Sequence, residues 1–83
     1  MKISADQITV RNGAKVIAEV TAALRSGDSV VDFSGVKHID STAIAVLLAA
    51  KRVLKTDKTL QVKHAPAQLE SLIAAYGVQS LFS

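Results

Sequence analysis

Residues 29–52 read SVVDFSGVKHIDSTAIAVLLAAKR, which is a short apolar run, a loop and a long apolar stretch. Residues 29–33 lie between two glycines, are rich in β-branched side chains and are apolar on both faces except at Asp32, as in a strand inside a covered sheet. Residues 42–56 show helical periodicity after the pair Asp40 and Ser41. This segment therefore predicts a central strand followed closely by a helix.

The flanking segments continue an alternation of strands and helices. Residues Val16, Val20 and Leu24 recur at a spacing of four, which is typical of one helix face. Helices that alternate with strands in this way favour parallel strand pairing through right-handed crossovers, and hence an α/β fold in a single domain, residues 1–83. The other predicted elements are one or two short strands in residues 2–10 with a turn near residues 5–6, a helix between Asn12 and Gly27, a strand over residues 59–63, and a helix from Pro66 to Gly77, after which residues 78–83 add an apolar patch.

Composition excludes many functional classes. The chain has 83 residues, of which 49% are hydrophobic and 20% charged, so it has enough apolar surface to fold but little room for a deep substrate cavity. It has no cysteine, which excludes disulfides, thiol catalysis and cysteine-based zinc sites. A net charge of +3 and only three aromatic residues argue against nucleic-acid binding. The N-terminus lacks an apolar leader, and no apolar run is long enough to span a bilayer, so we expect a cytoplasmic protein without a cofactor.

The wheel of the helix after Ser41 is apolar on two sides. One arc is expected to face the core and holds Ala43, Val46, Leu47, Ala50, Val53 and Leu54. The opposite arc holds Ser41, Ile44, Ala45, Leu48 and Arg52, with Lys51 and Lys55 along its border. An exposed apolar strip with a basic rim indicates a docking surface, whereas the alternative is that the core arc has been placed on the wrong side.

Asp40 and Ser41 stand where this helix begins. Both residue types accept hydrogen bonds from the free N–H groups of a first turn, so one interpretation is an ordinary cap. The other is that Ser41 is a contact or phosphorylation site, since a phosphate there would alter docking on the adjoining strip. A catalytic triad of His38, Asp40 and Ser41 is disfavoured because the three residues lie within four positions. A metal site on His38 and His64 would need a third donor such as Asp40, and it is disfavoured because no helical or hairpin spacing joins these residues.

The stretch quoted above resembles the centre of a STAS domain, the module of sulfate transporters and anti-sigma-factor antagonists. AQLESLIAAYGVQSLF, residues 67–82, is similar to the third helix and closing segment of that family. The resemblance implies a small mixed sheet of about four strands with three helices mainly on one face. It also implies a non-enzymatic protein that binds a partner. The residues expected to contact the partner are Asp40, Ser41, Thr42, Ile44, Ala45, Leu48 and Arg52.

Two branches of this family make different use of the residue at position 41. In antagonists of anti-sigma factors, a kinase phosphorylates this serine and thereby releases the partner. In the branch resembling the B subunit of the Mla phospholipid ABC transporter, it lies in the contact with the transporter ATPase, at the cytoplasmic side of the inner membrane. The antagonists usually have an acidic residue where this chain reads VRNG, residues 10–13, and a glycine where it has Ala43. These departures, and the short ending at Ser83, favour the transporter branch.

Overall fold

Short strands and longer helices make up the chain, and they alternate except where two strands follow one another before the second helix. The computed structural model describes residues 1–54 and 58–77. The elements in chain order are β1 (Gln7–Ile8), α1 (Gly13–Arg25), β2 (Val30–Asp32), β3 (His38–Ile39), α2 (Thr42–Val53), β4 (Gln61–Lys63) and α3 (Ala67–Tyr76). The α/β class, the three helices and the strands expected within residues 29–33 and 59–63 are therefore confirmed, whereas the pattern of the sequence does not predict β3. The expected last patch, residues 78–83, lies outside the described residues.

The strands form two parallel pairs, β1 with β3 and β2 with β4. The parallel pairing predicted from the order of strands and helices is thus confirmed, whereas the single mixed sheet implied by the family resemblance is divided into two small sheets. The expected N-terminal hairpin is wrong. Lys2 forms a parallel bridge to Asp32 beside β2, whereas β1 pairs with β3, so the bend near Asp6 sends the two halves of this segment to different partners. Strands of two or three residues have too little pattern of their own to specify a partner.

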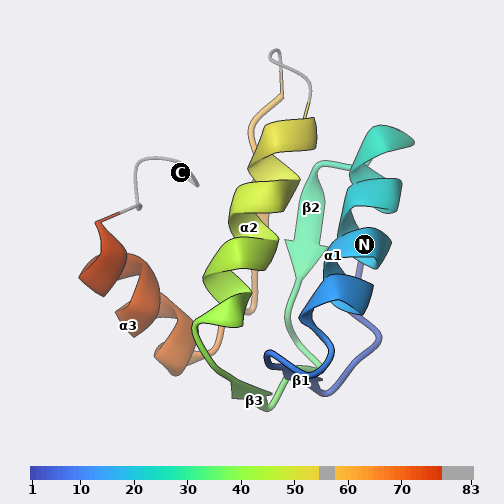
Figure 1. Cartoon of the computed structure of the whole chain (residues 1–83). Helices are drawn as coiled ribbons and strands as arrows, with labels where there is room; N and C mark the ends of the chain where they lie inside the picture. The colour runs from blue at the N-terminus through green and yellow to red at the C-terminus, as the bar shows by residue number, and fades with distance from the viewer. Residues whose placement is uncertain (55–57, 78–83) are drawn as a thin grey trace.

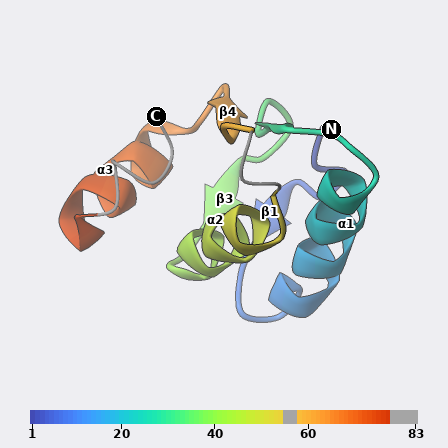
Figure 2. The ribbon, with the colours of Figure 1, turned by 90° about the horizontal axis from the view of Figure 1, so that it is seen from above.

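Helices α1 and α2 lie side by side on the same side of the β2–β4 pair, and α3 lies beyond α2 (Figures 1 and 2). The other face of this pair carries Asp32, Gln61 and Lys63, which are partly or fully exposed. The expectation that β2 is covered on both faces is therefore wrong. The buried core lies between the strands and helices and includes Ile3, Ile8, Val16, Val20, Leu24, Val31, Phe33, Val46, Leu47, Leu60 and Leu69.

Only some of the helix ends and caps predicted from the sequence are found in the structure. α3 begins after Pro66 and ends at Gly77, whose φ of 67° is the left-handed conformation that glycine adopts without strain. Asn12 precedes α1 but makes no capping hydrogen bond. α2 ends at Val53, and residues 55–56 of its predicted extent lie outside the described residues.

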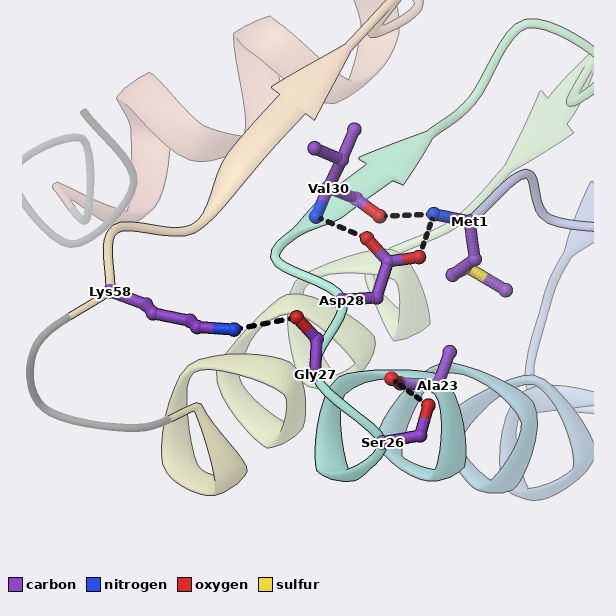
Figure 3. Close-up of polar contacts among 7 residues, drawn as sticks. All are labelled: Met1, Ala23, Ser26, Gly27, Asp28, Val30 and Lys58. Atoms are coloured by element: carbon purple, nitrogen blue, oxygen red, sulfur yellow. Dashed lines mark hydrogen bonds and ion pairs between the residues drawn. The ribbon is translucent and has the colours of Figure 1, made fainter.

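Hydrogen bonds fix the entry to β2 (Figure 3). The Met1 ammonium donates to Asp28 Oδ2 and to the Val30 carbonyl, each at 2.5 Å, and Asp28 Oδ1 accepts the Val30 N–H at 3.0 Å. The ammonium and then the Val30 N–H lower the pKa of Asp28 below its ordinary value. Lys58 Nζ donates to the Gly27 carbonyl at 2.6 Å, which links the chain just before β4 to the turn after α1.

Among the described elements, α1 and α2 make the most extensive contact, and their first residues lie against each other. Gly13, the first residue of α1, is buried, and a Cβ placed on it would overlap Thr42 Cγ2, in the first residue of α2. Glycine is required here by the space available. The start of α2 is thus held in position by the start of α1.

We predict that Gly13→Ala destabilises the protein by about 1–3 kcal/mol, because the added methyl group forces the two helix starts apart. Thr42→Ser removes the methyl group that the alanine side chain at position 13 would meet, and it keeps the hydroxyl. The double variant should therefore recover most of the lost stability. Chemical denaturation of both single variants and the double variant measures this coupling. Strictly additive effects would show that the two side chains do not compete for this space.

Candidate functional site

Asp40 joins three segments in front of α2. Its Oδ1 accepts the backbone N–H of Thr42 at 2.7 Å, and its Oδ2 accepts the backbone N–H of Val10 at 3.2 Å. Its own N–H donates to the Ile8 carbonyl at 3.1 Å. One carboxylate therefore caps the first turn of α2 and holds the loop between β1 and α1 against it.

These contacts favour the charged form of Asp40. The Thr42 hydroxyl, then the Thr42 N–H and the Val10 N–H, lower the pKa of Asp40 below its ordinary value. The carboxylate is thus ionised and already engaged by donors of its own chain. It serves to position the loop and the helix start.

Ser41 occupies the position before α2 but does not cap it. Its side chain makes no capping hydrogen bond, and its backbone is helical, with φ of −62° and ψ of −13°. Its neighbour Asp40 supplies the cap instead. Of the two sequence-based interpretations, the cap therefore applies to Asp40, and the exposed Ser41 side chain is left at the surface.

The outward strip predicted on α2 is largely present. Ser41, Ala45, Leu48 and Arg52 are exposed, and Leu48 keeps 38% of its surface accessible. At about 100° per residue these four side chains point within about 60° of one another. The opposite arc is buried as predicted: Ala43, Val46, Leu47, Ala50 and Leu54 belong to the core, and Val53 is partly buried.

Ile44 does not belong to the exposed strip, contrary to the prediction. It is only 3% exposed and belongs to the core cluster. Ile44 lies about 60° round the helix from Ser41, on the flank of α2, where a long side chain reaches the core. Thr42 is half-buried against Gly13, so it contributes little to the exposed surface of the strip and mainly packs against the start of α1.

Sequence reasoning missed Val10. The sequence places it in a predicted strand segment, residues 2–10, but it lies in the loop before α1, is 81% exposed and donates its N–H to Asp40. This contact places it at the same end of the molecule as Ser41. An apolar residue directly before Arg11-Asn12-Gly13, a turn-rich sequence, was the available indication of a loop.

The two histidines lie apart from this site. His38 is exposed on β3, and His64 follows β4, where its Nδ1 lies 3.0 Å from Asp32 Oδ1. The Ser34 N–H, and also His64, lower the pKa of Asp32. Within residues 1–54 and 58–77, no three histidine, aspartate or glutamate side chains gather as a metal site would require.

A hollow of about 330 Å³ lies beside α1, and the Ser4 hydroxyl at its edge donates to a Glu19 carboxylate oxygen at 2.7 Å.

Comparison with known proteins gives one match. A family model described as "Mlab, STAS domain" matches residues 5–83, nearly the whole chain. No curated protein and no solved structure gave a match. None of the described helices is long and apolar enough to cross a membrane.

The lowered pKa of Asp40 predicts a pH-dependent stability. Because the folded-state pKa is below the ordinary value of 3.8, the contribution of Asp40 is full above that value and is lost as the pH falls through the folded-state pKa. Asp40→Asn keeps one acceptor oxygen, but its amide nitrogen cannot accept the Val10 N–H. The variant should therefore melt at a lower temperature at pH 7, and the gap to wild type should narrow as the pH falls toward 2.

Thermal melting across this pH range measures the gap. Asp6→Asn is the matched control, since it alters an exposed carboxylate just before β1 and should change the melting temperature little at any pH. A gap between wild type and Asp40→Asn that stays constant down to pH 2 would contradict the role given to the Asp40 charge.

Proposed function

Because the chain belongs to the STAS domain family, we propose that it is a non-enzymatic interaction subunit that binds, and stabilises or regulates, the ATPase of an Mla-type phospholipid ABC transporter. In this role it lies at the cytoplasmic side of the inner membrane and reaches the membrane only through its partner. The description of the matching family supports this branch of the family. The missing acidic residue at positions 10–13 argues in the same direction.

The observation that carries the proposal is the exposed strip of α2 beside the Asp40 junction. Leu48 and Ala45 remain at the surface although the opposite side of the same helix belongs to the core, apart from the partly buried Val53. Asp40 and Gly13 fix the start of the helix, so the strip is presented without a loss of freedom on binding. A rigid helix that exposes an apolar strip, with polar residues at both ends of the strip, is typical of a surface that binds another protein.

The direct test is co-purification. A tagged copy of this chain should bring down the nucleotide-binding subunit of the Mla-type transporter from the same cell and raise its melting temperature. Absence of complex formation between the two purified proteins would overturn the proposal.

A second candidate function is an anti-sigma-factor antagonist that is switched by phosphorylation. It is favoured by one observation, namely that the Ser41 side chain is exposed and makes no capping hydrogen bond. Incubation with ATP and the kinase of an anti-sigma factor from the same cell would then add one phosphate at Ser41. Intact-mass spectrometry separates the two functions.

Leu48 and Leu47 provide a matched pair on α2. Leu48→Asp should leave the fold intact and weaken binding of the ATPase subunit by about 2 kcal/mol or more, as expected for a central interface residue. Leu47 is fully buried, so Leu47→Asp places a charge in the core and should unfold the domain. Circular dichroism and a binding titration check both variants. A folded Leu47→Asp together with an unfolded Leu48→Asp would reverse the assignment of the two faces.

Ser41 allows the contact role to be separated from a structural role. Because it makes no capping hydrogen bond, Ser41→Ala and Ser41→Asp should each change stability by only about 0.5 kcal/mol. Ser41→Asp should nevertheless weaken ATPase binding several-fold, because an added carboxylate would be desolvated in the interface without a partner. Melting and affinity are measured side by side for both variants. Affinity that is unchanged in both would remove Ser41 from the site.

A further inference from the structure

We propose that the loop carrying Val10 and Arg11 is the second half of the docking face, and that the partner surface is an apolar socket bordered by carboxylates. This inference rests on the proposed function, because it names the chemistry of the partner at the same site. It adds a second point of contact to the strip of α2. It also predicts that the partner surface is negatively charged.

The loop is held in one conformation. Asn12 Oδ1 accepts the Thr9 N–H at 2.9 Å, and Asn12 Nδ2 donates to the Gln7 carbonyl at 2.8 Å. Thr9 Oγ1 accepts the Arg11 N–H at 3.3 Å, and Asp40 accepts the Val10 N–H. Side chains on both sides of Val10 thus fix its backbone, although Val10 itself packs on little.

Val10 is the most exposed large apolar side chain among the described residues, at 81%. A flexible loop would lose conformational freedom when such a side chain entered a pocket, whereas this loop has already lost it on folding. Its N–H contact to Asp40 places Val10 beside the exposed Ser41. Val10 is therefore positioned to enter an apolar pocket of a protein that also covers α2.

The charges around these apolar residues have one sign. The loop, residues 9–12, and α2 carry Arg11, Lys51 and Arg52 and no acidic side chain. The carboxylate of Asp40 already accepts hydrogen bonds from its own chain. A partner with carboxylates around its apolar pocket is thus complementary, and a second copy of this chain, which would bring arginines together, is not.

Other occupants of a basic face are weaker candidates. Clusters that attract anionic lipid usually hold four to eight basic residues. Within the part of the chain that the structure describes, the loop and α2 carry three, and these are spread from the loop to the last turn of α2. Apolar contact at Val10 and Leu48 combined with this sparse charge favours a protein surface.

Binding kinetics with the purified nucleotide-binding subunit of the Mla-type transporter test the inference. Val10→Ser should raise the dissociation rate about tenfold, since the side chain loses its pocket but supports little of the fold. Arg11→Glu should slow association about three- to tenfold at low salt, and the difference should shrink at 0.5 M salt. Arg25→Glu is the matched control. Arg25 is exposed in the last turn of α1, about 18 Å along the helix from the loop, and its reversal should change neither rate.

Leu48→Asp separates this inference from the proposed function. If it abolishes binding while Val10→Ser and Arg11→Glu bind like wild type, the second contact is refuted and the proposed function stands. If Leu48→Asp itself binds like wild type, the α2 face is refuted. Binding to phosphatidylglycerol vesicles that Arg11→Glu removes, or a dimer that Val10→Ser dissociates, would also overturn the inference.

Discussion

The carboxylate of Asp40 is the contact on which the candidate site depends. It accepts one N–H from the first turn of α2 and another from Val10 in the preceding loop. Val10 and Asp40 are 30 residues apart in the sequence, and the loop and the start of α2 form one surface because this side chain binds both. The close approach of Gly13 to Thr42 fixes the same corner from the side of α1. Two short-range contacts thus determine how an exposed serine, an exposed valine and an exposed helix face are presented together.

This arrangement separates two tasks within one helix. The inner side of α2 packs into the core and includes the fully buried Leu47, while the outer side leaves Leu48 accessible. A domain of this size has few large side chains to spare, so apolar residues left outside reduce the stability that it could have had. We infer that they are kept for binding. Among the described residues, the far face of the β2–β4 pair exposes Gln61 and Lys63 beside the half-buried Val30 and Asp32, and it shows no comparable exposed apolar strip.

The sequence predicts the buried face of a helix well where the same spacing of apolar residues repeats several times. The spacing of Val16, Val20 and Leu24 identified the buried side of α1, and all three are buried. It failed where a single residue or a very short strand decides. Ile44 lies on the flank of α2, where periodicity alone does not distinguish core from surface. Asn12 has a capping side chain, but that side chain bonds to the loop before it. The turn-rich residues after Val10 indicate a loop there, but the position of Val10 beside the start of α2 depends on a contact with Asp40 that only the folded chain creates.

Cross-saturation NMR of the labelled chain, bound to the nucleotide-binding subunit of the Mla-type transporter, tests most directly whether binding uses this corner. It identifies the amides that lie at the interface without any substitution. The account predicts that saturation reaches Val10, Ser41 and Leu48 and leaves Gln61 and Lys63 unaffected. Saturation confined to β4 and the exposed face of the β2–β4 pair would show that the chain binds its partner through the opposite side.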